Sequence, residues 1–376
     1  MPSINIVRES GIERTGRVLQ LEGLFDVAPS KKSRVEWTCD LPIEEQDWNI
    51  GLILGASGSG KSTVLAEMFG GDKVASLRWS KTKAVVEGFR DDLSIREITG
   101  ALSSVGFSSP PSWLRPHSVL STGEQFRANI ARVMIENKSE IVGVDEFTSV
   151  VDRTVAKVGS AAIAKSVRRN GQKLVAASCH YDIVEWLQPD WTYEPAENLF
   201  QWRSVQRFPE IVLRVEQVHS SAWEIFKRHH YMSAKINRAA QCFVAFWDDR
   251  PVAFDAYLPF PHPKRPRTRR ETRVVVLPDF QGIGIGKAVS SLIGEKCLGE
   301  GFRFIASTGH PANIEARRNS PLWRMTNSNA RDKRLRKRIA SKHGDMARAT
   351  RRSICSFEYI GKPRAASPLA ADLLQV

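Results

Sequence analysis

Short apolar runs alternate with segments of helical spacing along the first half of the chain. Residues 48–54 are almost continuously apolar, and the glycine-rich turn after them leads into residues 63–69, which have the spacing of a helix. Two further apolar runs, residues 141–144 and 173–178, each follow a segment with helical spacing. Strands that alternate with helices in this way predict an α/β fold.

The second half of the chain has another order of elements. Its polar and apolar positions predict strands at residues 241–247, 252–258, 272–277, 301–308 and 351–360. A helix is expected at residues 221–230, before the first of these strands, and another from the glycine-rich turn near residue 284 to Gly299. Two strands joined by a short turn come first, and this order differs from that of a dinucleotide-binding fold.

The chain is long enough for more than one domain. A length of 376 residues indicates two domains of ordinary size. Residues 188–202 carry prolines and show no clear period, so we expect a boundary near residue 200, with domains at residues 1–200 and 201–376. Within the second domain, residues 261–270 form a Pro-rich basic loop and residues 331–338 form a basic run that looks helical.

Positive charge is concentrated in the second domain. The whole chain has 55 Lys and Arg against 41 Asp and Glu, a net charge of +14. Residues 1–200 have 23 against 26, a net of −3, so residues 201–376 have 32 against 15, a net of +17. A field of this sign favours a polyanion such as a nucleic acid, or an acidic surface. The alternative is a solvated basic face that has no partner.

The composition also indicates the cellular setting. The five cysteines form no CxxC or CxxxC pair, which predicts reduced thiols rather than a disulfide framework or a zinc site. No segment approaches the roughly 18 apolar residues that a membrane span needs, and the N-terminal residues do not have the pattern of a signal peptide. We expect a soluble, cytoplasmic protein that has no membrane partner.

The turn after residue 54 has the composition of a phosphate-binding loop. Its sequence, Gly55-Ala-Ser-Gly-Ser-Gly-Lys-Ser62, matches GxxxxGKS and lies between a strand and a helix, as a P-loop does. The glycines let backbone N–H groups surround phosphate oxygens, the lysine reaches the outer phosphates, and the final serine hydroxyl ligates Mg²⁺. The residues expected to bind ATP and Mg²⁺ here are Gly55, Ser57, Gly58, Gly60, Lys61, Ser62 and Thr63.

Four further motifs follow the P-loop in a fixed order. Leu120-Ser-Thr-Gly-Glu-Gln125 precedes a helical segment, and an apolar strand then ends in Asp145-Glu146. Ser149-Val-Val-Asp152 comes next, and a later strand ends at His180. In this order and spacing they resemble the signature, Walker B, D-loop and switch motifs of the ABC-type ATPases, and the resemblance covers residues 35–190.

The resemblance to ABC-type ATPases implies a head-to-tail homodimer that forms with ATP. Asp145 would share Mg²⁺ with the P-loop serine, and Glu146 would orient or deprotonate the attacking water. His180 would contact the γ-phosphate. Ser121 and Gly123 would reach the nucleotide from the other subunit.

Two departures from the family pattern change the expected function of this half. The interval between the P-loop and the signature motif is shorter than in transporter subunits, and it contains no glutamine before Gln125. In transporters this region docks onto the membrane partner, so its shortening argues against a transporter. The missing glutamine leaves one contact to Mg²⁺ or water unassigned, and the sequence leaves open whether this slows ATP turnover.

A second glycine-rich turn joins a strand to a helix. Residues 272–277 are followed closely by Gln281-Gly-Ile-Gly-Ile-Gly286, which opens a helix. This order resembles motif A of the GNAT acetyltransferases, and the likeness covers about residues 210–360. It implies a mixed α+β sheet in which glycine N–H groups and the helix dipole hold the pyrophosphate of acetyl-CoA. The residues expected to bind acetyl-CoA are Val276, Leu277, Gln281, Gly282, Gly284, Gly286 and Lys287.

The residues that act on the acceptor are less well marked. GNAT enzymes often use a tyrosine after the fifth strand as general acid, and residues 309–323 contain none. Tyr231 and Ser307 are the expected catalytic candidates, and His310 and Glu315 are weaker ones. Each of these side chains could instead be a structural group.

The tandem arrangement resembles a prokaryotic and viral family in which an ABC-type ATPase is fused to a predicted acetyltransferase. The helix and hairpin of the second domain are also similar to the phage Mom proteins, which modify adenine in DNA. With the basic charge, these likenesses imply an ATPase that transfers an acyl-derived group to a nucleic acid, with DNA bases favoured. Two alternatives stay open: an N-acetyltransferase of proteins or small molecules regulated by its ATPase half, and a non-catalytic nucleic-acid-binding ATPase.

Overall fold

The chain forms two compact units in the computed structural model. The model describes residues 3–25, 30–137, 139–203, 211–230, 235–261, 265–328, 354–364 and 371–376. Unit 1 comprises Met1–Leu77, Asn137–Val150 and Val167–Arg207. Unit 2 comprises Arg78–Glu136, Val151–Ser166 and Phe208–Val376. The expected boundary near residue 200 stays a prediction, and the contacts add that a helical part of the first half belongs to the same unit as the second half.

Unit 1 is built on a five-stranded sheet with the strand order β4-β5-β3-β6-β7. These strands are β3 (Ile50–Leu54), β4 (Ile141–Val144), β5 (Lys173–Ser178), β6 (Trp191–Glu194) and β7 (Leu199–Trp202). The first four strands in this order are parallel, and β7 is antiparallel to β6. Helix α2 (Lys61–Phe69) packs on β4 and β5, and every residue of β3 is buried. The short helices η3 (Tyr181–Ile183) and α7 (Val184–Leu187) follow β5.

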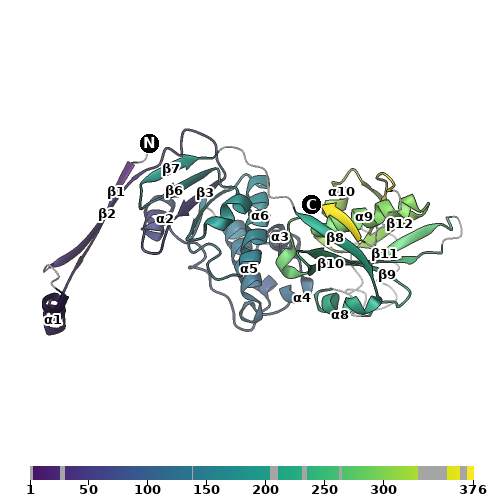
Figure 1. Cartoon of the computed structure of the whole chain (residues 1–376), viewed down its shortest axis with the longest axis horizontal. Helices are drawn as coiled ribbons and strands as arrows, with labels where there is room; N and C mark the ends of the chain where they lie inside the picture. Colours follow the sequence, from purple (N-terminus) through teal and green to yellow (C-terminus); the bar gives the residue numbers. More distant parts are fainter. Residues whose placement is uncertain are drawn as a thin grey trace. The chain divides into compact units, whose positions relative to one another are not determined.

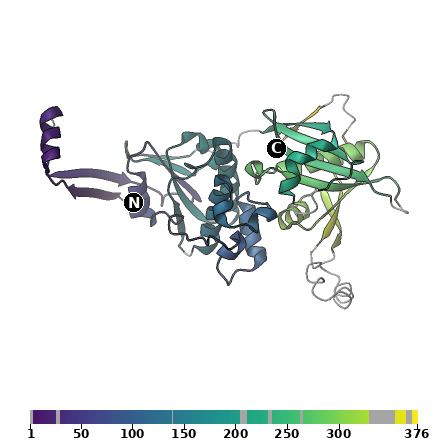
Figure 2. The same ribbon diagram turned by 90° about the horizontal axis from the view of Figure 1, so that it is seen from below.

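A hairpin that the sequence pattern did not predict precedes this sheet. Strands β1 (Ser3–Gly11) and β2 (Lys32–Asp40) are antiparallel, and α1 (Gly16–Phe25) lies between them in sequence. Figures 1 and 2 both show α1 at the end of the hairpin. No residue of α1 is buried, although Leu24 and Phe25 are large apolar side chains.

Unit 2 contains an eight-stranded mixed sheet with the order β13-β14-β12-β11-β10-β9-β8-β15. Its strands are β8 (Val212–Val218), β9 (Gln241–Trp247), β10 (Arg250–Pro259), β11 (Thr268–Val276), β12 (Arg303–Thr308), β13 (Trp323–Ser328), β14 (Cys355–Tyr359) and β15 (Ala371–Gln375). Only β11 and β12 pair in parallel within the described sheet. The mixed α/β fold expected from the sequence is confirmed.

Helices cover both faces of this sheet. On one face Trp223 and Phe226 of α8 (Trp223–Phe226) pack on Phe254 of β10. On the other face lie α9 (Ile285–Gly299) and α10 (Pro311–Arg318), as Figure 1 shows. The helix expected over residues 221–230 is wrong in its continuity, because the segment is broken into η4 (Ser220–Ala222), α8 and η5 (Lys227–His229).

The remaining part of unit 2 is the helical subdomain, which we define as Arg78–Glu136 with Val151–Ser166. It contains η1 (Val85–Gly88), α3 (Ile95–Ser104), α4 (Pro110–Trp113), η2 (His117–Val119), α5 (Thr122–Glu136) and most of α6 (Arg153–Arg169). Helix α3 packs against α5 and also against α10. Among the helices of the described residues, none is long and apolar enough to cross a membrane.

Candidate ATP and acetyl-CoA sites

Glycines set the backbone conformation of the P-loop (residues 55–62), and the lysine of the loop folds back onto its backbone. Gly58 and Gly60 have φ angles of 83° and 96°, which favour glycine. The Lys61 Nζ donates to the carbonyl oxygens of Gly55 and Ala56 at 2.8 and 2.7 Å. Because this ammonium group lies at the N-terminus of α2, the loop presents positive charge to a phosphate group.

Gly55 is buried, whereas the other predicted residues of this loop are at least partly accessible. The side chains of Ser57 and Ser62 are exposed, and Thr63 is half-buried. Ser62 is the second residue of α2, where its hydroxyl lies beside the lysine that would meet the outer phosphates.

The motifs after β4 and β5 lie at the same edge of the sheet as the P-loop. Strands β3, β4 and β5 are parallel neighbours, so their carboxyl ends coincide. Asp145 directly follows β4, and its Oδ1 accepts a hydrogen bond from the Glu146 N–H at 2.8 Å. Glu146 is exposed and has a φ of 46°, a strained value for a side-chain-bearing residue. His180 follows β5, and its N–H donates to the Ser178 Oγ at 3.1 Å.

These groups fit a magnesium–nucleotide complex by their chemistry. Carboxylate and hydroxyl oxygens are the donors that Mg²⁺ prefers, and a nucleotide site commonly supplies only one or two protein ligands. Asp145 and Ser62 have these donors. Among the described residues, no three His, Cys, Asp or Glu side chains gather into a metal site that the protein fills alone. The remaining ligands would therefore be phosphate oxygens and water.

Trp37 is a P-loop contact that the sequence analysis missed. It lies on β2 of the hairpin, and its Nε1 donates to the Ser59 carbonyl oxygen at 3.1 Å. A Cβ added to Gly60 would lie 2.3 Å from that nitrogen, so only glycine fits beneath the indole. No local pattern around residue 37 marks this contact, because the partners are 22 positions apart.

The signature motif begins α5 with a capping box. The Ser121 Oγ accepts from the Glu124 N–H at 3.3 Å, and the Glu124 Oε2 accepts from the Ser121 N–H at 3.1 Å. Glu124 departs from the usual ABC signature, and this geometry gives it a structural role. Ser121 is exposed, whereas Gly123 is buried so closely that an added Cβ would lie 2.7 Å from the Val155 Cγ1.

The Gly284 loop (residues 281–286) connects the end of β11 to α9. Gly282 and Gly284 have φ angles of 96° and 103°. Within the described part of the chain, the backbone N–H groups of residues 282–286 donate no hydrogen bond to the protein. Gly284 and Lys287 are exposed, and an added Cβ at Gly286 would lie 3.0 Å from the Val276 Cγ2. Unused donors at a helix N-terminus form a binding surface for a phosphate group.

Strands β11 and β12 separate beside this loop. Their parallel pairing covers only Thr268–Arg270 with Arg303–Ile305. Strand β10 pairs with the other edge of β11 as far as Val276. The outer edge of residues 271–276 therefore has backbone groups with which an amide-containing chain such as pantetheine could pair. The Val276 carbonyl oxygen already accepts from the Gln281 Nε2 at 2.8 Å, and the Leu277 N–H donates to the Val252 carbonyl oxygen at 2.9 Å.

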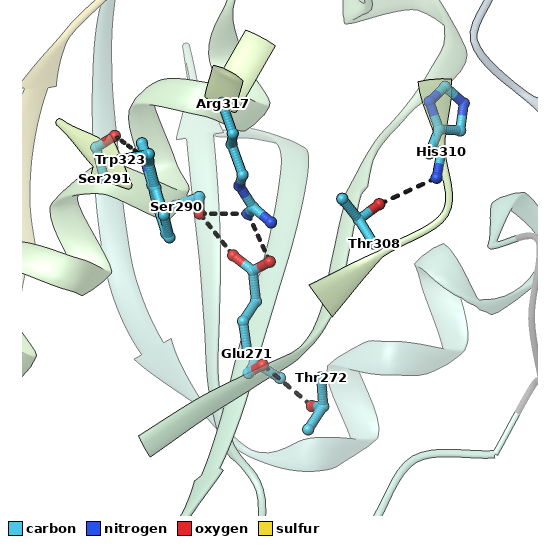
Figure 3. Close-up of polar contacts among 9 residues, drawn as sticks. Glu271, Thr272, Ser290, Ser291, Thr308, His310, Arg317 and Trp323 are labelled. Carbon is cyan, nitrogen blue, oxygen red and sulfur yellow. Dashed lines mark hydrogen bonds and ion pairs between the residues drawn. The ribbon is translucent and has the colours of Figure 1, made fainter. Parts of the chain in front are cut away.

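A buried polar network lies where these strands begin to separate (Figure 3). The Glu271 carboxylate accepts from the Ser290 Oγ at 2.5 Å and from the Arg317 Nη2 at 2.6 Å, and that guanidinium also donates to Ser290 at 2.9 Å. Arg317 stacks on Trp323 at 4.5 Å. The three polar groups come from β11, α9 and α10, so the network ties both helices to the strand.

The acceptor candidates differ in where they lie. Ser307 is the last residue but one of β12 and is exposed, with its Oγ 2.9 Å from the Ser356 Oγ. His310 is buried, its Nε2 lies 3.1 Å from the Ser108 carbonyl oxygen, and burial lowers its pKa. Glu315 is exposed on α10, and Tyr231 lies outside the described residues. Tyr257 is buried on β10, and this burial raises its pKa to about 12.

Comparison with known proteins gives matches to both halves. Residues 181–319 match the model of the acetyltransferase (GNAT) family. A dimeric bacterial ABC transporter cassette has a TM-score of 0.35 and 13% identity, over 46% of this chain and 94% of its own. CbiO1 from Clostridium perfringens, part of an ABC transporter complex, has a TM-score of 0.32 and 19% identity, over 41% of this chain and 75% of its own.

A third solved structure is similar to the second half. It is a Bacillus subtilis acetyltransferase in complex with CoA, with a TM-score of 0.29 and 15% identity, over 39% of this chain and 97% of its own. A search of curated proteins found no significant match. The family match identifies residues 181–319 as similar to the GNAT acetyltransferases, and the order of motifs in the first half resembles that of the ABC-type ATPases.

Proposed function

We propose that this protein hydrolyses ATP and uses acetyl-CoA, or a related acyl donor, to modify a nucleic acid, with DNA bases favoured. The acyl carbonyl would be attacked by an amine of the acceptor, and the CoA thiolate would leave. The observation that carries the acyl-donor part is the set of unused N–H groups at residues 282–286, next to the free edge of β11.

The ATPase part rests on the shared sheet edge of unit 1. The P-loop lysine would bind the outer phosphates, and Asp145 would hold Mg²⁺ with Ser62. Glu146 and His180 would orient the attacking water and the γ-phosphate. Ser121 and Gly123 of a second copy would complete the site, which makes an ATP-dependent homodimer part of the proposal.

The nucleic-acid part rests on cations that the protein does not neutralise. Arg265 and Arg267 are exposed in the segment that leads into β11, and Arg270 is exposed on that strand. Within the described residues none of them forms an ion pair with a carboxylate. Together with the +17 net charge after residue 200, calculated from the sequence, these side chains suit a phosphate backbone.

Mass spectrometry of nucleosides tests the proposal. DNA and RNA would be isolated from cells that express the wild type, Gly284→Glu or Glu146→Gln. Gly284 is exposed and has a left-handed φ, so a glutamate there both strains the loop and repels pyrophosphate. We expect a new modified nucleoside with the wild type and none with Gly284→Glu. Its level with Glu146→Gln reports whether ATP hydrolysis is needed.

Gly171→Glu is the matched control. Gly171 has a φ of 63°, is exposed in the turn between α6 and β5, and an added Cβ there meets nothing within 4 Å, so the substitution has the same backbone cost. It should retain the modified nucleoside. If neither the wild type nor any variant yields one, and purified protein binds neither DNA nor RNA at low salt, the nucleic-acid acceptor is wrong. Acetylation of a protein or amine in the same extracts would then assign the acceptor instead.

A further inference from the structure

The helix that begins at the ATPase signature motif also holds the segment before the Gly284 loop. Arg127 of α5 is 1% exposed, and its guanidinium donates to the carbonyl oxygens of Pro278 and Asp279, the latter at 3.2 Å. It also donates to the Gly106 carbonyl oxygen at 3.4 Å. Burial lowers the pKa of Arg127 to about 10, which leaves it charged at neutral pH. A buried cation bound to three carbonyl oxygens fixes these segments strongly.

Gln281 makes a second connection to the helical subdomain. Its Oε1 accepts from the Ser108 N–H at 2.7 Å, while its Nε2 donates to the Val276 carbonyl oxygen at 2.8 Å. One amide thus joins the end of β11, the first residue of the Gly284 loop and the turn after α3. The His310 Nε2 lies 3.1 Å from the Ser108 carbonyl oxygen, so the same turn also contacts the start of α10.

Two glycines leave no free space in this contact. A Cβ added to Gly106 would lie 2.5 Å from the Gln281 carbonyl oxygen. A Cβ added to Gly282 would lie 2.6 Å from the Ala162 Cβ and 2.8 Å from the Gly106 Cα. Because backbone touches backbone here, the Gly284 loop cannot shift toward the helical subdomain unless that subdomain moves as well.

The signature motif and Arg127 belong to one rigid element. Helix α5 has 15 residues, and the capping box of Ser121 fixes its first turn. Arg127 lies six positions after Ser121, which corresponds to about 9 Å along the helix axis. A displacement of the signature turn therefore reaches the carbonyl oxygens of Pro278 and Asp279 through a single helix.

We propose that Arg127 is a positioning residue of the Gly284 loop and that it couples CoA binding to nucleotide binding at the signature motif. A nucleotide that favours one position of α5 changes the affinity of the loop for CoA, and CoA changes the affinity for the nucleotide by the same factor. This inference rests on the proposed function, because it needs both ligands to bind where that proposal puts them.

Calorimetry on the full chain tests the coupling. The Kd of CoA would be measured without and with a non-hydrolysable ATP analogue and Mg²⁺, and the Kd of the analogue without and with CoA. We expect both to change by one common factor of about 5 to 150. In Arg127→Lys, which keeps the charge but loses the fork geometry, both ligands should still bind and the factor should fall toward 1.

Arg132→Lys is the matched control on the same helix. Arg132 pairs with Glu136 at 3.1 Å and stacks on Trp79, and it has no contact with the Gly284 loop. In Arg132→Lys, the factor by which one ligand changes the Kd of the other should equal that of the wild type. If Arg127→Lys does not fold, Arg127→Met takes its place, since it removes the hydrogen bonds of the guanidinium without leaving a charge buried.

Two results would contradict the coupling but leave the proposed function unaffected. The first is independent binding of CoA and analogue to the wild type, and the second is an unchanged factor in the folded Arg127→Lys or Arg127→Met variant. Failure of CoA or of the analogue to bind the wild type at all would instead contradict the proposed function itself.

Discussion

Two buried carboxylates, Asp255 and Glu271, lie near the Arg317 guanidinium, which pairs with only one of them. Asp255 is fully buried, and both of its carboxylate oxygens lack a hydrogen-bond partner among the described residues. Glu271 takes the ion pair with Arg317, at 2.6 Å. Burial, and then the charge of Glu271, raise the pKa of Asp255 well above its usual value, which favours the protonated form in the folded protein.

Asp255→Asn should therefore stabilise the protein, and more at pH 8 than at pH 5. A folded-state pKa above that of the unfolded chain means that Asp255 favours folding below about pH 4, and that this contribution is lost as the pH rises through the folded-state pKa. An asparagine has no such loss. Urea unfolding of both proteins at the two pH values measures the difference.

Asp372→Asn is a contrasting control for this measurement. Asp372 is also buried, but its carboxylate lies 2.6 Å from the Lys296 Nζ. Removing that charge leaves the ammonium without this partner, so the variant should lose on the order of 3 kcal/mol. Equal effects of the two substitutions would contradict the proposed protonation of Asp255.

The same network explains why part of β11 was not predicted. The sequence indicated a strand from residue 272, whereas β11 begins at Thr268. Its first half reads as polar because it contains Arg269, Arg270 and Glu271. The carboxylate among them is buried against Arg317, 46 positions later, and no local pattern can contain such a pair.

At the scale of elements, continuous apolar runs predicted strands correctly, whereas segments without a clear period did not reveal the strands that they form. Strand β9 occupies the predicted residues 241–247, since four of its seven residues are buried in succession. By contrast, the segment 188–202 has no period in the sequence but forms β6 and β7, which buried tryptophan and tyrosine side chains hold in the sheet. Prolines between short strands conceal their alternation.

Two glycines inside helices should respond in opposite ways to alanine. Gly294 of α9 faces Tyr359, and an added Cβ would lie 2.6 Å from its ring, whereas Gly100 of α3 has nothing within 4 Å. Gly294→Ala should destabilise the protein by about 1–3 kcal/mol through overpacking. Gly100→Ala should stabilise it by about 0.5–1 kcal/mol, because alanine has less freedom in the unfolded chain.

Urea denaturation curves for the two alanine variants check this contrast. The slope of the transition should match the wild type in both, so that a shift of the midpoint reports stability alone. If the midpoint shifts in the same direction for both variants, Gly294 of α9 does not pack as tightly against Tyr359 of β14 as the structure indicates.

At the scale of the whole molecule, the position of the helical subdomain was the least predictable feature. The sequence places residues 78–136 between ATPase motifs, and nothing in their local pattern points to Pro278 or Gln281. The contacts that place this subdomain in unit 2 span 151 to 202 positions. The binding motifs could be predicted because each lies in a short stretch of sequence. The contacts between the helical subdomain and the Gly284 loop could not, because they join residues far apart in the sequence.

Cutting the chain between residues 203 and 211 should leave the two pieces associated. An inserted protease site at this position would separate the polypeptide while Arg127, Ser108 and Gly106 still contact the segment around Gln281. We expect both pieces to co-elute from a sizing column at about 1 μM, as interfaces of domain size do.

Gly282→Leu provides the comparison for the cut protein. A leucine there collides with Ala162 and with the backbone of Gly106. Its two pieces should separate on the column after cleavage, although the uncut variant stays one chain. If the pieces of the wild type separate as readily, the contact is too weak to act as described.

The contact between Gly106 and Gly282 also limits how such a chain can change through evolution. A side chain at Gly106 meets the backbone of Gln281, and a side chain at Gly282 meets the backbone of Gly106, so a substitution at one glycine cannot be compensated at the other. An acetyltransferase domain from another protein could replace this one only if its loop also had a glycine at the position of Gly282. We therefore expect the two halves to be exchanged only as a pair, and a split chain to keep this contact only if both products keep the glycine pair.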